Sequence, residues 1–261
     1  MTDTLLIAYL TLVGGALGSF LNVCIYRWPA GESVIRPRSR CPGCGTPIPW
    51  YDNIPVLSWL ILRGRCRRCG EKISIQYPAV ELATALIWLG TALWLGPGLA
   101  AVRGALFLSI LLGIAIIDGK HQIIPDQFSL GGTALGLGIA AWPDGFPLQT
   151  AVIGAGVAYA LMWGVKWAAE AVLKKPALGV GDIHMMAMIG AFLGLSGALL
   201  TVFLGSALGL LIGVPVAWFR GKLEALGTYL PLGTFLAMGA AVAYLWGEPL
   251  LSWYLGYAFP T

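Results

Sequence analysis

Long apolar runs separated by short polar or glycine-rich breaks make up most of the 261-residue chain. They predict eight membrane-spanning helices, near residues 4–26, 79–95, 99–118, 124–142, 149–173, 182–195, 197–218 and 230–247. Because the runs are continuously apolar and do not alternate, we expect an all-α polytopic membrane protein and not a β-barrel. The run at 182–195 is shorter than the usual roughly 17 to 25 residues, so we expect it to pack inside the bundle or to continue into irregular backbone.

The composition leads to the same class of protein. Hydrophobic residues make up 58% of the chain and charged residues 11%, whereas roughly 25% of the residues in a soluble domain are charged. This excludes a soluble enzyme, and the number of runs excludes a single-span receptor. The first run has no basic segment before it and no small-residue cleavage site. Residues 1–26 are therefore expected to be the first transmembrane helix and not a removable signal peptide.

Lys and Arg residues gather on one side of the predicted spans. If the N-terminus lies outside, fifteen of the sixteen are on the inner side and only Arg103 is outside. Nine of them fall within residues 27–78, and the others are Lys120, Lys166, Lys174, Lys175, Arg220 and Lys222. The positive-inside rule therefore predicts this orientation. Attraction to anionic lipid also accounts for the net charge of +4 without a nucleic-acid partner.

Residues 27–78 form a polar insert on the inner face, between the first two predicted spans, and residues 79–261 would form a seven-helix domain. The insert holds seven of the sixteen prolines and 12 of the 28 charged residues, which sets it apart from the apolar remainder. A domain of this size buries too little apolar surface to be stable alone, so we expect a disulfide or metal to hold it together.

Four of the five cysteines lie in this insert in two pairs, Cys41-Pro-Gly-Cys44-Gly and Cys66-Arg-Arg-Cys69-Gly, with 21 residues between the pairs. Each C-x-x-C turn presents two thiolates to one cation, and the following glycine lets the backbone turn its amides toward sulfur. Cys41, Cys44, Cys66 and Cys69 are therefore predicted to hold a structural zinc ion. The alternative is a redox pair in a membrane thiol oxidoreductase, but a reducing cytoplasmic face favours zinc. Cys24, in the first span, is expected to be a small buried apolar residue.

Three acidic residues lie where predicted spans begin or end. Asp118 closes the third span, Asp126 follows Pro125, and Asp182 ends the segment Gly179-Val-Gly-Asp. An ordinary helix start explains Asp126, and Asp182 could also cap a helix. Asp118 has no such explanation, because a negative charge is disfavoured at a helix C-terminus. Two carboxyl groups at one depth can share a proton and activate water, as in an aspartic protease. A proton-coupled transporter is the alternative, although it should show two related halves with broken helices.

The motifs resemble those of the type IV prepilin leader peptidases, a family of GxGD-type intramembrane aspartic proteases. Segments that match the family extend along almost the whole chain. They are Gly18-Ser-Phe-Leu-Asn22-Val-Cys-Ile-Tyr-Arg27-Trp-Pro29, the two cysteine pairs around Tyr51-Asp52-Asn53-Ile54-Pro55-Val-Leu-Ser-Trp59, Tyr77-Pro78-Ala-Val-Glu81-Leu, Asp118 through Pro125-Asp126, Gly179-Val-Gly-Asp182, and Leu230-Pro-Leu-Gly233-Thr-Phe. The segments before residue 83 resemble the methylation domain of the family.

The resemblance implies an enzyme of a bacterial inner membrane with Asp118 and Asp182 as its catalytic pair. Its substrates would be type IV prepilins or type II secretion pseudopilins, whose basic leader is cut at the cytoplasmic face. S-adenosylmethionine would then methylate the new N-terminus, although no glycine-rich nucleotide fingerprint marks its site. One ionised Asp would take a proton from water while its protonated partner donates to the carbonyl oxygen. From the helix ends we expect Asp118 to hold the proton and Asp182 to be the base.

Two residues depart from the pattern of the family. His184 stands where the family often has Lys, and Thr234 after Gly233 replaces the more usual Pro. Two residues turn an ideal helix by about 200°, so we expect His184 to face away from Asp182 and to serve in tuning or packing.

Overall fold

The computed structural model describes residues 2–143, 145–176, 178–219 and 231–258, and the regular secondary structure in this part of the chain is helical, apart from two isolated β-bridges in the mostly irregular insert. The prediction of an all-α fold is confirmed. The chain divides into two compact units, Met1–Ser109 and Ile110–Thr261. The predicted basic residues Arg220 and Lys222, and Leu230 of the last motif, lie outside the described residues.

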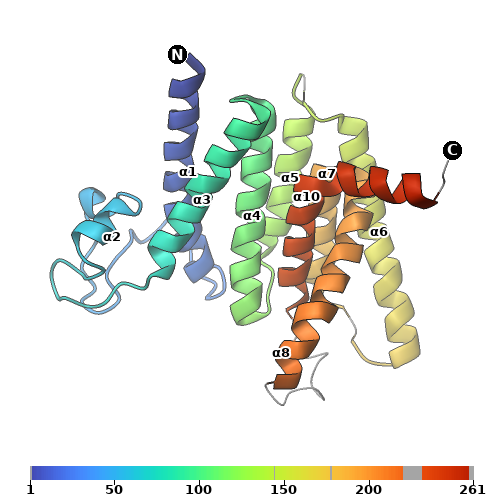
Figure 1. Ribbon diagram of the computed structural model, residues 1–261. Coiled ribbons are helices and arrows are strands. Elements are labelled where there is room, and N and C mark those ends of the chain that lie inside the picture. The colour runs from blue at the N-terminus through green and yellow to red at the C-terminus, as the bar shows by residue number, and fades with distance from the viewer. Residues whose placement is uncertain (1, 144, 177, 220–230, 259–261) are drawn as a thin grey trace. The chain divides into compact units, whose positions relative to one another are not determined.

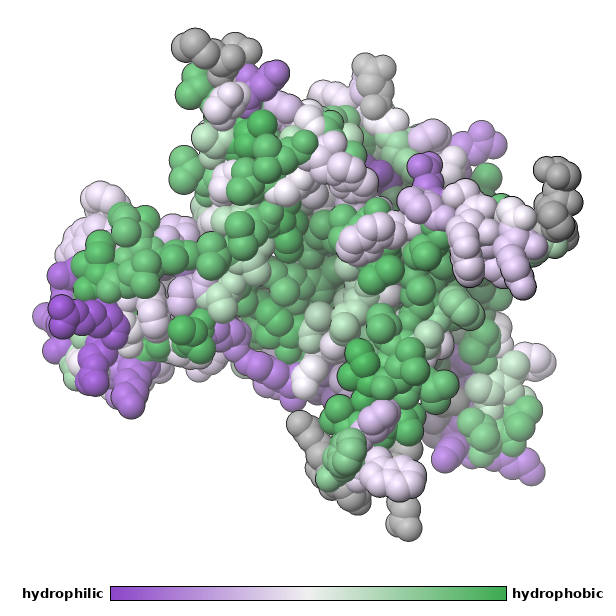
Figure 2. Space-filling view, viewed as in Figure 1, coloured by the Kyte–Doolittle hydropathy of each residue, from purple (hydrophilic) through white to green (hydrophobic). Residues whose placement is uncertain are grey.

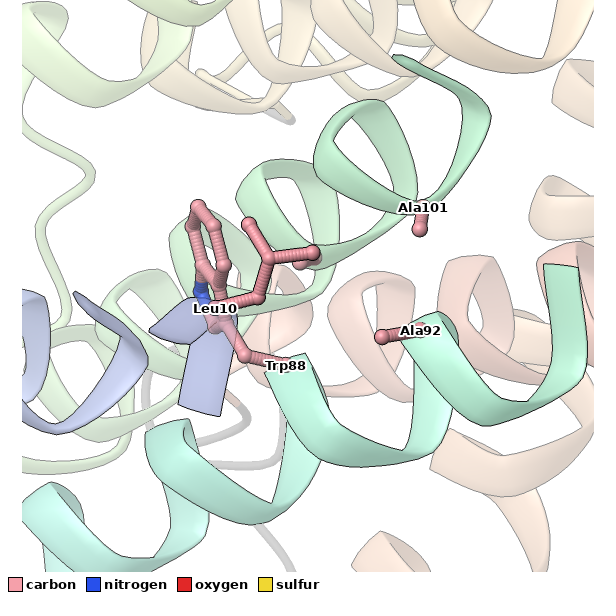
Figure 3. Packing of buried hydrophobic residues seen from close by; sticks show 5 residues of the cluster. Leu10, Trp88, Ala92 and Ala101 are labelled. Carbon is pink, nitrogen blue, oxygen red and sulfur yellow. The ribbon is translucent and has the colours of Figure 1, made fainter. Parts of the chain in front are cut away.

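The first unit contains α1 (Thr2–Arg27), the insert with its short helices η1 (Trp50–Asp52) and α2 (Leu57–Ile61), α3 (Gln76–Leu95) and the first half of α4 (Leu99–His121) (Figure 1). Its core is formed by Leu10 of α1, Trp88 and Ala92 of α3, and Ala101 and Ala105 of α4 (Figure 3). The indole Nε1 of Trp88 donates a hydrogen bond to Ser109 Oγ at 3.2 Å, so its polar edge is satisfied within the apolar packing.

The second unit contains the remainder of α4, then α5 (Asp126–Ala140), α6 (Leu148–Leu173), α7 (Val180–Leu208), the π-helical turn η2 (Gly209–Gly213), α8 (Val214–Phe219) and α10 (Leu232–Ala258). Glycines bring its helices into close contact. A Cβ at Gly190 would overlap the backbone of Gly154 in α6, and a Cβ at Gly239 in α10 would lie 2.6 Å from the backbone nitrogen of Gly205. Small residues therefore permit the backbone approach that is typical of helix packing in lipid.

Helix α7 is bent back on itself at Gly194. This residue has φ 69° and ψ −175°, which no α-helix contains and which residues with a side chain rarely adopt. Met186 and Val202 line the same pocket, although sixteen residues of straight helix would separate them by about 24 Å. The two arms, 180–193 and 195–208, correspond to the separate apolar runs predicted at 182–195 and 197–218.

Six segments of the described chain are long and apolar enough to cross a membrane: Asp3–Arg27, Gln76–Leu95, Leu99–His121, Leu148–Leu173, Val180–Val216 and Leu232–Ala258. The fifth includes both arms of α7. The predicted span at 124–142 is the shorter helix α5, of 15 residues. The chain is thus a multi-pass membrane protein.

Candidate active site and metal centre

Asp118 lies near the end of α4 and is almost fully buried, with 5% of its surface exposed. Its Oδ2 atom accepts two hydrogen bonds from Thr234 in the first turn of α10, from the backbone N–H at 2.6 Å and from the hydroxyl at 3.0 Å. The Thr234 hydroxyl also lies 3.2 Å from the carbonyl oxygen of Ala115. The carboxyl group is therefore fixed through one oxygen, and Oδ1 is left to carry or release a proton.

Asp182 occupies the first turn of α7 and is half-buried. Gly179 is the N-cap of this helix, and its backbone forms a hydrogen bond with the Asp182 carboxyl group. This is the return half of a capping box, in which an acidic residue at the third helical position reaches back to the N-cap amide. The Asp182 and Asp118 carboxyl groups interact electrostatically. The structure therefore brings together the two aspartates that the sequence singled out, from helices 64 positions apart.

Ile124 packs between the two glycine turns that flank the aspartates. A Cβ at Gly181 would lie 3.0 Å from Ile124 Cβ, and a Cβ at Gly233 would lie 2.7 Å from Ile124 Cδ1 and 3.0 Å from the Asp118 carboxyl carbon. Real Cβ atoms essentially never show a contact of 2.7 Å, and contacts of 3.0 Å are tighter than nine in ten. Glycine at both positions thus lets the starts of α7 and α10 approach the segment that follows Asp118.

His184 pairs with Asp126. Its Nδ1 atom lies 2.8 Å from Asp126 Oδ1, at the first residue of α5. The imidazole also stacks on Tyr159 of α6, with 6.2 Å between ring centroids and 8° between the planes. Asp126 begins a helix after Pro125, as expected, but it also joins α5 to α7. His184 accordingly connects three helices, α5, α6 and α7.

Lys166 fixes the turn that precedes Asp182. Its Nζ atom donates to the carbonyl oxygen of Leu178 at 2.9 Å and forms an ion pair with Glu170 at 2.6 Å, four residues along α6. Leu178 directly precedes the N-cap residue Gly179. The C-terminal end of α6 is thereby tied to the backbone that positions Asp182.

The four cysteines of the insert form one cluster. All of their Sγ atoms lie within 4.8 Å of one another, and the Cys41 and Cys69 sulfurs are 3.7 Å apart. None of these cysteines forms a disulfide. Sulfurs that each lie about 2.3 Å from a tetrahedral zinc ion are about 3.8 Å from one another, so this arrangement fits a metal ion with a Cys₄ ligand set.

The two cysteine turns have the same backbone structure, with left-handed glycines directly after Cys44 and Cys69, as predicted. Gly45 has φ 69° and donates its N–H to the carbonyl oxygen of Cys41, and Gly70 has φ 74° and donates to Cys66. Hydrogen bonds with Thr46 lower the pKa of Cys44 to about 6, and bonds from the backbone amides of Cys69 and Arg68 lower the pKa of Cys66. Both shifts favour the thiolate form that a metal requires, whereas desolvation and the neighbouring cysteines raise the pKa of Cys69 to about 12, so a cation would have to displace its proton.

A pocket of about 290 Å³ lies between the C-terminal half of α1 and the insert. Polar groups in its lining come from Ser19, Arg27, Arg38, Ser39 and Asn53, and apolar ones from residues such as Phe20 and Val23. The guanidinium of Arg27 is anchored by a hydrogen bond from Nη1 to the carbonyl oxygen of Ser33 at 2.9 Å. The volume of the pocket is near the lower end of the range for small-molecule sites, which combine apolar walls with a few polar groups.

Thr234 and Ile124 lie at the site, but the sequence did not predict a role for either. Thr234 was noted as a departure from Gly-Pro, but its role depends on a contact with a residue 116 positions earlier in the chain. The only local signal was that a threonine retains the N–H and hydroxyl donors that proline lacks. Ile124 carries no chemical signal, since it acts by packing against glycine.

Comparisons with known proteins match two family domains, one around the four cysteines and one around the two aspartates. Residues 12–95 match the bacterial peptidase A24 N-terminal domain, and residues 105–214 match the type IV leader peptidase family. The first range contains the cysteine cluster, and the second contains both aspartates. No solved structure was found to match the chain.

Curated relatives align along most of the chain. A prepilin leader peptidase/N-methyltransferase from Pseudomonas putida is 36% identical over 275 residues, which cover 96% of this chain and 94% of the relative. Proteins of the same name from Aeromonas hydrophila and Klebsiella pneumoniae are 36% and 40% identical, over 92% and 76% of this chain and 90% of each relative.

Proposed function

The chain belongs to the prepilin leader peptidase/N-methyltransferase family, and from that premise we propose that it removes the basic leader of type IV prepilins or type II secretion pseudopilins and methylates the new N-terminus. One observation carries the first half of the proposal. Asp118 lies near the end of α4 and Asp182 at the start of α7, yet their carboxyl groups interact. Thr234 is hydrogen-bonded to Asp118, and Gly179 to Asp182. The thiol oxidoreductase and transporter alternatives have no comparable support.

The aspartate pair cleaves the peptide by activating water. One carboxylate takes a proton from a water molecule, whose oxygen attacks the scissile carbonyl, while the protonated partner donates to the carbonyl oxygen. Collapse of the resulting diol then transfers a proton to the leaving nitrogen, which breaks the C–N bond. Because Thr234 holds Oδ2 of Asp118, the proton on this residue is exchanged through Oδ1. The assignment of Asp118 as the acid and Asp182 as the base stays a prediction.

The shape of the substrate suits a site at the membrane boundary. A prepilin has a polar leader followed by an apolar helix, so its scissile bond lies where water meets lipid. A helical backbone shields its carbonyl carbons, and the substrate must therefore unwind locally. Asp118 and Asp182 lie at helix ends, where the approach of an extended peptide needs no break in the bundle.

The proposed topology has eight crossings, with the N-terminus outside and the active site on the cytoplasmic side of a bacterial inner membrane. Six segments qualify by length and composition, the two arms of α7 count separately, and α5 adds the eighth crossing. The basic residues support the orientation, because fifteen of sixteen fall on the inner side in this arrangement.

Residues 27–78 are proposed as the methylation domain, held together by zinc on Cys41, Cys44, Cys66 and Cys69. Zinc is structural here: four thiolates close its coordination shell, and its binding free energy stabilises a domain with little core of its own. S-adenosylmethionine supplies the methyl group. We assign it to the pocket beside α1, where Arg27 and Arg38 can bind a carboxylate and apolar side chains can receive the adenine ring.

Mass spectrometry of a processed prepilin tests both activities together. Purified enzyme in lipid vesicles, mixed with a prepilin and S-adenosylmethionine, should release the leader and add the mass of one methyl group to the remainder. Asp182→Asn should leave the prepilin uncut but still methylate a pilin whose leader was removed beforehand. Arg38→Ala should do the reverse, with normal cleavage and slower methylation. Equal loss of both activities in each variant would contradict the division between the two sites.

A further inference from the structure

The insert contains an apolar segment that lies against the middle of two membrane-spanning helices. Residues 53–62 carry no charged side chain, although Asp52 precedes them and Arg63 follows. Pro55 packs on the backbone of α1 beside α3. A Cβ at Gly15 would lie 3.6 Å from Pro55 Cβ and 3.9 Å from Ala85 Cβ, so these three residues meet at one point.

That point lies near the middle of the membrane. Gly15 is midway between Asp3 and Arg27, the two charged residues of α1. Twelve residues of helix separate it from each, or about 18 Å, whereas half the hydrocarbon thickness of a bilayer is about 15 Å. Ala85 is likewise near the centre of α3 (Gln76–Leu95). Two independent helices therefore place Pro55 at the depth of the acyl chains.

The backbone of the segment is hydrogen-bonded in a way that suits a medium without water. The N–H of Val56 donates to Glu81 Oε2 in α3 at 2.7 Å, and Val56 has φ 62°, a conformation rare for a β-branched residue. The N–H of Ile54 donates to Ser58 Oγ at 3.0 Å, and this hydroxyl donates to the carbonyl oxygen of Tyr51 at 3.0 Å. Unpaired backbone groups are costly in hydrocarbon, and irregular backbone is found there only where protein groups satisfy it.

The outward face of the segment is apolar. Leu57, Leu60 and Ile61 of α2 are 50%, 58% and 65% exposed. Figure 2 shows hydrophobic side chains over α2 that continue onto the adjoining helices of the first unit, with hydrophilic side chains gathered at the edge of the insert. Leu86, on α3, is 55% exposed and belongs to a helix that spans the membrane. The exposed face of α2 is thus continuous with a surface that lipid covers.

We propose that residues 54–62 form a re-entrant segment that enters the membrane from the insert, contacts lipid acyl chains through Leu57, Leu60 and Ile61, and is held at this depth by Glu81. The insert is then not an aqueous domain throughout. It is anchored in the bilayer between α1 and α3, which keeps its cysteine cluster at the membrane face. Glu81 lies in the second turn of α3, beyond the first turn where the helix dipole favours an acidic residue. The proposal gives it a structural role, as the acceptor for the Val56 N–H.

The depth of α2 can be measured with a nitroxide label on a genetically encoded keto residue, which leaves the zinc cysteines untouched. Label is placed at Leu60 in the full-length protein, in vesicles of phosphatidylethanolamine and phosphatidylglycerol. Collisions with dissolved oxygen, which concentrates in hydrocarbon, are compared with collisions with a water-soluble nickel chelate. Label at Leu86 is the lipid-facing control, and label at Ile35, 82% exposed in the insert, is the aqueous control.

The ratio of oxygen to nickel collisions at Leu60 should match that at Leu86 and be several-fold higher than at Ile35. A ratio equal to that at Ile35 would overturn the proposal, and so would low values for both reagents, which would indicate that another protein covers α2. Label at Ile61 repeats the measurement in case Leu60 tolerates substitution poorly. Glu81→Leu should raise the nickel collisions at position 60, whereas Glu81→Gln, which keeps an acceptor for the Val56 N–H, should change them little.

Discussion

The hydroxyl of Thr234 offers the sharpest test of the aspartate site, because Thr234→Val changes the hydrogen bonding and almost nothing of the shape. Valine keeps the backbone N–H that donates to Asp118 at 2.6 Å and removes the hydroxyl at 3.0 Å. A single hydroxyl proton is divided between Asp118 and the carbonyl oxygen of Ala115. Asp118, assigned as the acid, becomes charged as it gives up its proton in the transition state, and the loss there is near the lower end of the range for a hydrogen bond to a charged group, about 1.5 kcal/mol.

If that energy orients Asp118 in the transition state, leader cleavage by Thr234→Val should be slower by about tenfold in kcat, since about 1.4 kcal/mol corresponds to one factor of ten. KM should stay unchanged, because Thr234 contacts the carboxyl group and not the substrate. The assay is time-resolved mass spectrometry of prepilin cleavage in vesicles. Thr234→Ser, which restores the hydroxyl, should recover most of the rate.

Methylation of a pilin without its leader serves as the control for folding, because this activity is assigned to the insert. It should be equal in the wild type, Thr234→Val and Thr234→Ser. Cleavage by Thr234→Val within twofold of the wild-type rate would refute the reasoning, since the hydroxyl would then make no contribution to the position of Asp118. A change in KM alone would refute it as well.

Three further results are expected. Asp118→Asn or Asp182→Asn should abolish cleavage in a protein that still inserts into the membrane, while Asp126→Asn should only slow it; normal processing by either catalytic variant would exclude the pair. Metal analysis should find one zinc per chain, released on acidification because protons compete with the metal for the four thiolates; a disulfide in its place would favour redox chemistry. Gly233→Ala should lower the rate of cleavage more than the rate of methylation, because its Cβ would lie 2.7 Å from Ile124 Cδ1 and 3.0 Å from the Asp118 carboxyl carbon. Cleavage at the wild-type rate would contradict this and show that Ile124 moves aside freely.

Local patterns in the sequence predicted the helices and the chemistry. A run of apolar residues must be helical in lipid whatever surrounds it, because no other open structure satisfies its backbone there. The spacing C-x-x-C-G fixes a turn within five residues, and the structure shows the left-handed glycines at Gly45 and Gly70 that this turn needs. Asp118 was singled out because a carboxyl group at the end of an apolar helix has few ordinary explanations, and Asp182 because it was expected at the same depth as Asp118.

The sequence also predicted a break between two apolar runs near residue 196. The direction in which the chain turns there could be known only from the structure. Gly194 turns α7 back, two residues before that point. Glycine at several nearby positions could have made the same turn. Packing decided among them, because a Cβ at Gly194 would lie 2.9 Å from Thr150 in α6, and a larger residue would not fit there.

Contacts between distant segments were decided by the tertiary structure alone. Thr234 meets Asp118 across 116 residues, and His184 meets Asp126 across 58. Nothing in the local pattern of either residue specifies its partner, because a hydrogen bond depends on where two helices cross and not on the residues beside them. The same holds for Glu81 and Val56: the sequence places one in a span and the other in a polar insert, and their contact arises because α1, α3 and the insert pack around Gly15. Composition and spacing thus determined which side chains were candidates for chemistry, and helix packing determined which of them contact one another.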